Sequence, residues 1–166
     1  MFICSAILDF QTGLTAIADD RKTKFYQIQN SVEFIPQIIT IDKLSDAWIV
    51  FTLENIDERK YMNEENKVFK EAKRIIISSG HIYWLKLAAG FVDGYMDPFG
   101  GEHLYEMFAA TISQKAGCIV TNKDGVDFDA AKYLKTFEND SNFIYYPIAA
   151  RSKQLHRQLL TALRLN

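Results

Sequence analysis

The sequence predicts an α/β protein built from α+β layers, in which antiparallel strands are followed by a mixed sheet flanked by helices. Three observations support this prediction. Short apolar runs separated by turn residues fill the first third of the chain, and apolar residues at helical spacing alternate with short strand-like runs from about residue 61 onward. The stretch 88–125 reads as helix, strand, loop, helix, strand and turn, which is a compact α/β unit. We therefore expect a single domain over 1–166, with mostly antiparallel strands in 1–56 and an α/β layer in 61–166.

The opening third carries several strand signals. Gly13 lies in a turn between the first two of them, which we expect to pair as a hairpin. Pro36 interrupts another run and indicates an edge or a bend, because proline has no N–H to donate to a sheet. The expected strands are Phe2–Phe10, Leu14–Ala18, Phe25–Ile28, parts of Val32–Ile41, and Ala47–Leu53.

Two helices and a buried strand are expected next. Asn63 is a suitable N-cap for a helix that reaches Lys73, with Glu64 and Glu65 in its first turn. Ile75–Ile77 reads as a short strand, and His81–Ala89 reads as the second helix.

The stretch that follows contains the clearest local pattern. Phe91–Met96 predicts a short strand, and the proline and glycines of 98–101 predict a loop. A helix is expected next, because Leu104, Met107, Phe108, Thr111 and Ile112 recur at steps of three and four. Gly117 suits its left-handed C-terminal cap, Cys118–Thr121 predicts a strand, and Asn122–Gly125 predicts a turn.

The last forty residues are less regular. We expect Val126–Asp140 to be an irregular inserted segment and Phe143–Ile148 to be a strand. Ser152 can cap a final helix, whose apolar stripe consists of Leu155, Leu159, Leu160 and Leu163.

Composition narrows the class of protein. A net charge of −2 gives no electrostatic reason to expect nucleic acid or an anionic membrane as a partner. Cys4 and Cys118 are far apart and have no His or Cys at zinc-site spacing, so we expect neither a zinc site nor a disulfide framework, and a reducing cytoplasm is the expected compartment. No run reaches the roughly 20 apolar residues that a membrane span needs, and the first residues do not resemble a signal peptide.

The 88–125 stretch resembles the C-terminal half of the inositol monophosphatase family, the Mg-dependent sugar and inositol phosphatases. The family reads roughly AAG-x-x-DG-[FY]-x-E, and then P-W-D-x-A-A-G, E-A-G-G and [ST]-D-x-x-G. The matching segments here are 88–90, 93–95 with Asp97, 109–110, 115–118 and 121–125. The order of elements outside this stretch is also similar to the family, and Met1 corresponds to a point well inside the family domain.

The resemblance implies phosphate-ester hydrolysis assisted by two or three Mg²⁺ ions, which carboxylate oxygens bind. The family draws these ligands from an acidic helix pair, a D-P-[IL]-D-G-T segment and the Asp of W-D. The first two motifs are not found in this sequence, and in register the W-D pair falls on Leu104-Tyr105. A neutral phenol is a poor Mg²⁺ ligand, and Glu106 lies one helical step, roughly 100°, away. We therefore expect no cofactor, with Mg²⁺ bound only if a partner chain completes the site.

Four positions remain as candidates for substrate binding by resemblance: Asp97, Ser79, Tyr105 and Glu106. Asp97 occupies a position where the family often has a Glu that contacts a substrate hydroxyl, although a loop carboxylate before Pro98 can instead accept local backbone N–H groups. Ser79 matches the family's Gly-Ser serine. The catalytic residues stay unknown, and we expect His81 and His156 at the surface and Cys118 to be a small buried residue.

Three functions remain open. The first is a truncated or degenerate member of this family that has no independent phosphatase activity and acts as a structural or binding subunit. The second is one half of a split Mg-dependent phosphomonoesterase, which another chain docked on the opening strands would complete. The third is an unrelated small α/β interaction protein of the inhibitor or immunity type. A homo-oligomer or a complementary chain is the expected partner, and a small phosphorylated ligand is possible.

Overall fold

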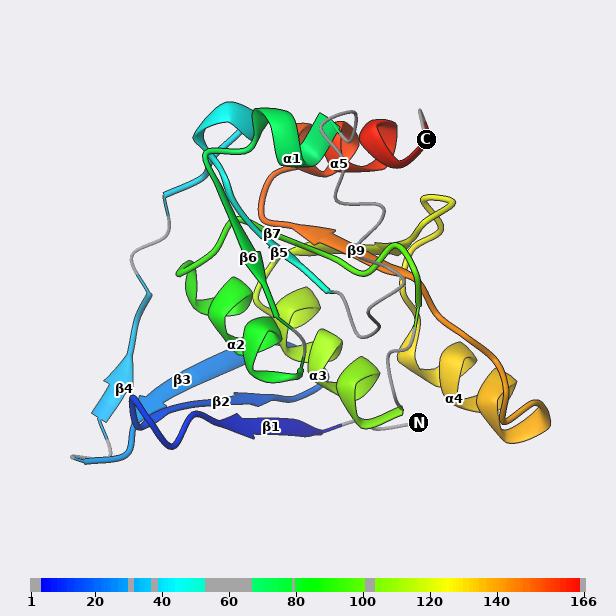
Figure 1. The fold of residues 1–166 in the computed structure, drawn as a ribbon. Helices are drawn as coiled ribbons and strands as arrows, with labels where there is room; N and C mark the ends of the chain where they lie inside the picture. The colour runs from blue at the N-terminus through cyan, green and yellow to red at the C-terminus, as the bar shows by residue number, and fades with distance from the viewer. Residues whose placement is uncertain are drawn as a thin grey trace.

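A computed structural model describes residues 4–29, 32–36, 39–52, 67–78, 80–100 and 104–164, with the backbone alone at 104–106 and 164. The chain forms two sheets with helices between them and outside them (Figure 1). None of the helices in these ranges is long and apolar enough to cross a membrane. The predicted class, an antiparallel sheet followed by a mixed sheet flanked by helices, is confirmed.

The first sheet contains four antiparallel strands in the order β1-β2-β3-β4. Tight turns set its register, because Asp9 and Asp19 each accept backbone N–H groups two and three residues further on. The strands are β1 (Ser5–Leu8), β2 (Leu14–Ala18), β3 (Thr23–Gln27) and β4 (Val32–Phe34). The hairpin expected around Gly13 is present, since β1 and β2 pair antiparallel with Leu8 opposite Thr15.

The second sheet is mixed and has the order β6-β5-β7-β9-β8. Its central strand β5 is parallel to both β6 and β7, and β9 pairs antiparallel with β7 and β8. The strands are β5 (Trp48–Phe51), β6 (Arg74–Ile77), β7 (Gly94–Met96), β8 (Ile119–Asn122) and β9 (Pro147–Ala150). β5 belongs to this sheet, and the four strands that precede it form the antiparallel one.

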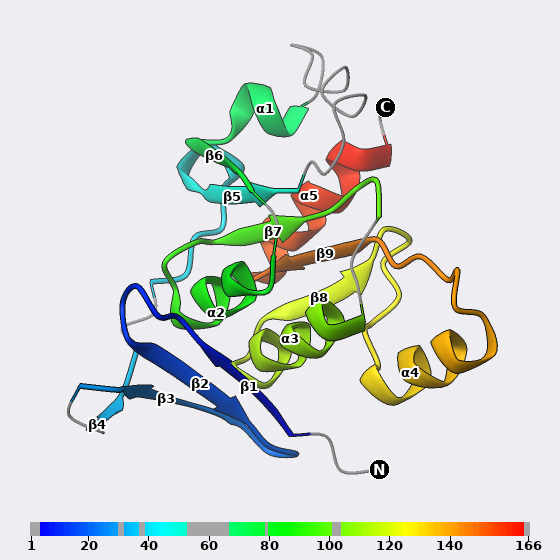
Figure 2. The same cartoon turned by 60° about the horizontal axis from the view of Figure 1, so that its bottom comes forward.

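Helices complete the layers. α2 (Ile82–Ala89) and α3 (Leu104–Lys115) lie between the sheets, while α1 (Lys67–Glu71) and α5 (Lys153–Arg164) lie on the outer face of the second sheet (Figures 1 and 2). A short 3₁₀ helix, η1 (Leu44–Asp46), precedes β5, and α4 (Ala130–Asn139) projects to one side.

Two apolar clusters hold these layers together. The one between the sheets includes Leu14, Trp84, Tyr95, Met107 and Val120, which are at most 5% exposed. The other lies between the second sheet and the outer helices, and it includes Ile49, Phe51, Met96, Leu155 and Leu159, which are fully buried. Burying one large apolar side chain of this kind contributes roughly 1.5–3 kcal/mol, so the apolar faces of both the strands and the helices stabilise the layers.

Two expectations about the last forty residues were wrong. The segment 126–140, expected to be irregular, contains α4, whose N-cap Asp129 accepts the backbone N–H groups of Ala131 and Lys132. The strand expected at Phe143–Ile148 lies later, at Pro147–Ala150, where all four residues are buried. The small side chains of Ala149 and Ala150 allow the sheet to be covered closely on both faces.

Candidate functional site

Polar groups gather where the parallel strands end. Thr52 follows β5, Ser78 follows β6, and Asp97 follows β7, and backbone hydrogen bonds tie them to neighbouring strands: Thr52 N to Met96 O at 3.0 Å and Ser78 N to Phe51 O at 3.3 Å. In α/β sheets, ligands bind outside the carboxyl ends of parallel strands. The sheet topology therefore favours a ligand site at the C-terminal ends of β5, β6 and β7, which we call this edge of the sheet.

Asp97 is the buried carboxylate at this edge, 1% exposed. Its Oδ1 accepts the backbone N–H groups of Phe99 at 3.2 Å and Gly100 at 3.0 Å, so the side chain organises the loop that follows β7. Gly100 has a φ of +72°, and a Cβ there would lie 2.3 Å from Ile144 Cγ2. The loop conformation therefore depends on both the carboxylate and the glycine.

Two hydroxyls meet at the ends of β5 and β7, although they are 43 residues apart in the sequence. Thr52 Oγ1 donates to the phenolic oxygen of Tyr95 at 3.1 Å, and both side chains are buried. The Tyr95 ring packs against Trp84 with centroids 4.3 Å apart, which fixes the phenol. The sequence analysis named neither residue as a site candidate: Tyr95 was only the aromatic residue of the matched segment 93–95, and Thr52 lies in no matched motif.

The other predicted site residues are only partly placed. Ser79 lies outside the described residues, directly after Ser78 at the end of β6. Tyr105 and Glu106 lie in the first turn of α3, and their side chains are outside the description. The structure therefore places Asp97 and the end of β6 at the same edge of the sheet. Substrate binding by Ser79, Tyr105 and Glu106 stays a prediction.

The described donors at this edge do not fit a magnesium ion. Within the described ranges, no group of three His, Cys, Asp or Glu side chains is arranged to hold a metal. The described side-chain oxygen atoms there belong to one carboxylate, Asp97, and to the neutral hydroxyls of Thr52, Ser78 and Tyr95. Mg²⁺ in phosphatase sites relies on carboxylates, so we derive no catalytic step through a metal here.

His156 was expected at the surface, and this expectation was wrong. It is 6% exposed, on the face of α5 that packs against the sheet, and its Nε2 lies 3.0 Å from Thr121 Oγ1. Burial lowers the pKa of His156, because desolvation penalises the imidazolium. Cys118 is buried as expected, and burial raises the pKa of its thiol to about 11, which makes it a poor nucleophile.

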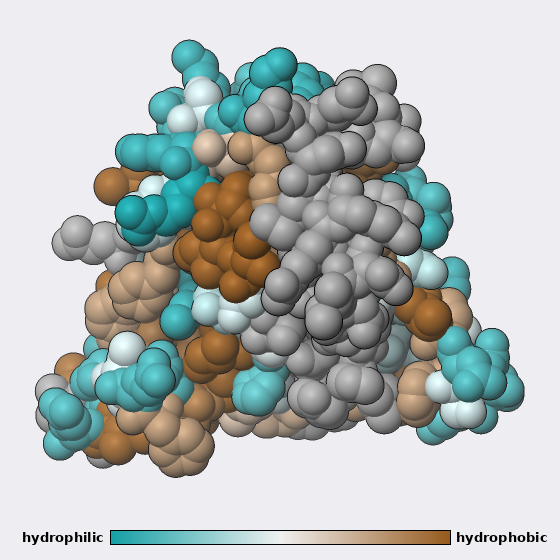
Figure 3. Space-filling view, viewed as in Figure 1, coloured by the Kyte–Doolittle hydropathy of each residue, from teal (hydrophilic) through white to brown (hydrophobic). Residues whose placement is uncertain are grey.

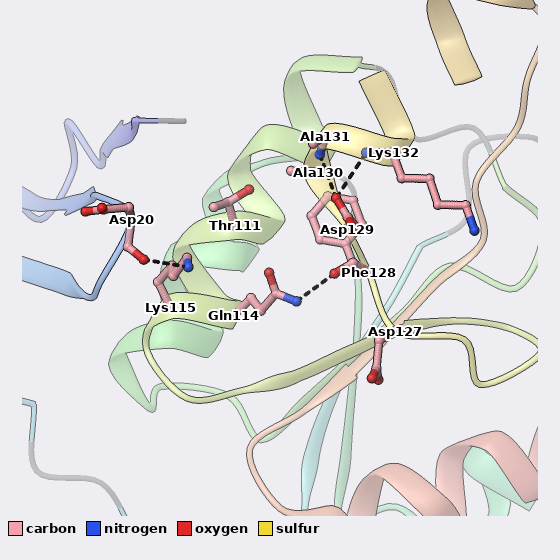
Figure 4. Close-up of a pocket in the computed structure, with 10 residues that line it drawn as sticks. All are labelled: Asp20, Thr111, Gln114, Lys115, Asp127, Phe128, Asp129, Ala130, Ala131 and Lys132. Atoms are coloured by element: carbon pink, nitrogen blue, oxygen red, sulfur yellow. Dashed lines mark hydrogen bonds between the residues drawn. The ribbon is translucent and has the colours of Figure 1, made fainter. Parts of the chain in front are cut away.

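A cavity of about 540 Å³ lies away from this edge, between α3 and the segment that leads into α4 (Figure 4). Thr111, Gln114 and Lys115 share one face of α3 and form one wall, and residues 127–132 form the other. No motif marked this cavity, since its second wall belongs to the segment that was expected to be irregular.

Comparisons with known proteins give a consistent result for the fold. No protein-family model matches the sequence, and a search of curated proteins finds no similar one. Among solved structures, the chain is similar to Mycobacterium tuberculosis SuhB, with 16% identity and a TM-score of 0.71 over 98% of this chain and 58% of that one. It is also similar to inositol monophosphatase from Anabaena (16% identity, TM-score 0.61, 92% and 64% covered).

A third similar structure is a Ca-bound IMPase family protein from Staphylococcus aureus, with 15% identity and a TM-score of 0.67 over 99% of this chain and 56% of that one. The chain has an inositol monophosphatase-like fold. It spans less than two thirds of the length of these three proteins. The fold predicted from the resemblance is confirmed.

Proposed function

We propose that this chain is a truncated or degenerate phosphatase-like protein that acts as a structural or binding subunit and does not hydrolyse phosphomonoesters by itself. The observation that supports this proposal is that the Asp97 side chain forms hydrogen bonds to its own loop. The carboxylate at the ends of the parallel strands accepts two loop N–H groups, and no acidic cluster accompanies it within the described residues. Tyr105 at the position of a family metal ligand is consistent with the same conclusion.

The strand ends still offer groups that suit a small phosphorylated ligand. Hydroxyls and loop N–H groups can bind phosphate oxygens without a metal, and serine residues at 78 and 79 follow β6 directly. Binding without turnover is therefore the activity that we propose for this edge. Cys4 and Cys118 are free thiols, and a reducing cytoplasm is part of the proposal.

An assay of the purified chain tests this function directly. Release of inorganic phosphate from several sugar phosphates is followed with and without Mg²⁺, beside an active phosphatase of the same fold as a positive control. We expect no turnover above the rate of a mock purification. Mg-dependent turnover that co-elutes with the chain on a sizing column would show that hydrolysis is retained.

A second candidate function, half of a split phosphomonoesterase, is favoured by the edges of the two sheets. β4 is an edge strand with all three residues exposed, and apolar atoms gather over the edge strand β6, where Ile77 is 48% exposed (Figure 3). Unpaired strand edges recruit partner chains. Purification of the tagged chain from its native cells tests this alternative: we expect an acidic partner that restores Mg-dependent hydrolysis, and a monomer or homo-oligomer without activity would exclude it.

A further inference from the structure

The cavity between α3 and α4 has two unlike walls. One wall is the α3 face with Thr111, Gln114 and Lys115, and the other is the turn of 127–132 that opens α4 (Figure 4). Its volume of about 540 Å³ lies within the range of roughly 300–1,000 Å³ that small-molecule sites occupy. This place is distinct from the strand ends described above.

Thr111 supplies the first sign of a ligand. Its side chain lines the cavity, the residue is 3% exposed, and its hydroxyl has no hydrogen-bond partner among the described residues. A threonine on a helix can bond to the carbonyl one turn earlier, but this hydroxyl does not do so. A buried hydroxyl costs free energy unless a partner reaches it, and a molecule in the cavity would be such a partner.

Gln114 adds an acceptor in a fixed orientation. Its Nε2 donates to the carbonyl oxygen of Phe128 at 2.7 Å across the cavity wall. Because a carbonyl can only accept, the amide nitrogen must face Phe128, and the amide oxygen is left on the side of Thr111 (Figure 4). This oxygen can accept a hydrogen bond from a ligand.

The charges around the cavity argue against an ionic ligand. The N-terminus of α4 would attract an anion, but Asp129 already caps it and accepts from Ala131 N at 2.9 Å and Lys132 N at 3.0 Å. An anion would therefore meet a carboxylate instead of free N–H groups. A cation would meet the ammonium group of Lys115, which donates to the carbonyl of Asp20 at 2.8 Å on the rim. The lining as a whole contains three carboxylates, of Asp20, Asp127 and Asp129, and two ammonium groups, of Lys115 and Lys132, so neither sign of charge dominates it.

We propose that this cavity binds a neutral polyhydroxylated ligand of mono- or disaccharide size. Its hydroxyls donate to the Gln114 amide oxygen and to the Asp129 carboxylate, and one of them pairs with the Thr111 hydroxyl. The Gln114 amide oxygen and the Asp129 carboxylate are both acceptors, so a ligand rich in O–H groups matches them. This inference goes beyond the proposed function and does not depend on it.

The test measures binding of D-glucose, D-galactose and maltose to the full chain by saturation-transfer NMR and titration calorimetry. Sodium phosphate and methylammonium chloride are the ionic probes. We expect at least one of the sugars to bind with millimolar or better affinity and to shift the amide resonances of Thr111, Gln114 and residues 129–132, while neither ion does so. Thr111→Val keeps the shape and removes the hydroxyl, and it should weaken sugar binding by about tenfold, the cost of roughly one hydrogen bond.

Thr161→Val is the matched control, because Thr161 is an exposed helical threonine on α5, outside the cavity. It should leave sugar binding unchanged. Thr111→Val should fold as the natural chain does, since an unpartnered hydroxyl is replaced by a methyl group, and its thermal unfolding checks this. The proposal is overturned if no sugar binds at 50 mM, if phosphate or methylammonium shifts these resonances instead, or if Thr111→Val binds sugar as tightly as Thr161→Val.

Discussion

The Arg151 guanidinium donates a hydrogen bond from Nη1 to the carbonyl oxygen of Ala88 at 2.8 Å. The same Nη1 also donates to the carbonyl oxygen of Leu87. Both carbonyls belong to the last turn of α2, where the helix dipole favours a positive charge, and the Leu87 carbonyl also accepts the backbone N–H of Gly90 at 3.2 Å. Arg151 directly follows β9, so this contact joins the second sheet to the helix layer between the sheets.

Removing this guanidinium should therefore destabilise the protein. For Arg151→Ala we expect a loss of about 2–3 kcal/mol in the free energy of unfolding, because two buried carbonyls lose a charged donor. Urea titration followed by circular dichroism measures it. Arg157→Ala, which removes an exposed arginine of α5, is the control and should change stability by less than about 0.5 kcal/mol; equal effects of the two variants would contradict this account.

Gly94 is predicted to be intolerant of any side chain. A Cβ there would lie 2.8 Å from Ile49 Cδ1 and 3.0 Å from Leu159 Cδ1, where β7 packs under α5. Gly94→Ala should cost about 1–3 kcal/mol through overpacking. Ile49→Val removes the nearest atom, so the double variant should be less destabilised than the sum of the two single variants. Simple additivity would show that the cost has another source.

Asp97 offers a test of its role in the loop. Asp97→Asn retains an oxygen that can accept from Phe99 and Gly100, whereas Asp97→Ala leaves both N–H groups without it. We expect the alanine variant to lose about 1–3 kcal/mol and the asparagine variant to lose less than half of that amount. Chemical denaturation of the two variants compares them, and an asparagine variant as unstable as the alanine variant would mean that the negative charge itself matters.

The buried His156 should make stability depend on pH. Burial lowers the pKa of His156 in the folded state, and the carbonyl of Ile148 and the charge of Asp127 oppose this effect only in part. The unfolded chain, with a pKa near 6.5, then binds the proton more readily. Stability should be constant above about pH 7 and should decrease as the pH falls through 6.5 toward the folded-state pKa.

Urea midpoints measured between pH 8 and pH 5.5 test this prediction. His156→Gln keeps a side chain that can reach Thr121 and cannot titrate, so its midpoint should fall less over this range. The difference between the two proteins isolates the histidine from the carboxylates, which titrate in both. A natural chain whose midpoint falls no more steeply than that of the variant would show that His156 has no altered pKa.

Local patterns accounted for much of the fold. The hairpin strand Leu14–Ala18, the helix cap at Gly117 and the leucine stripe of the last helix are each set by residues close in sequence, through turn chemistry and helical spacing. α4 was missed although Asp129 is a good N-cap and Tyr133 and Phe137 lie four residues apart. That signal was short and followed a turn, so periodicity alone did not distinguish it from an irregular segment.

For the candidate site, the sequence located Asp97 but not its neighbours. Thr52 and Tyr95 meet because β5 and β7 are adjacent parallel strands, although the two residues are 43 positions apart. Likewise, the cavity beside Thr111 exists only because α4 packs against α3, and nothing in the spacing of Thr111, Gln114 and Lys115 shows a second wall.

The sequence by itself determined most of the element types, with α4 as the exception, the apolar faces that form the layers and the absence of an acidic motif at the position of Tyr105. Local propensity and side-chain spacing are sufficient for these, because neighbours along the chain decide them. Only the tertiary structure decided which strands pair, that β5 is parallel to β6 and β7, and which buried polar groups lie together. Strand pairing and burial depend on contacts between residues that are distant in the sequence. A local sequence pattern does not show which of these contacts are favourable.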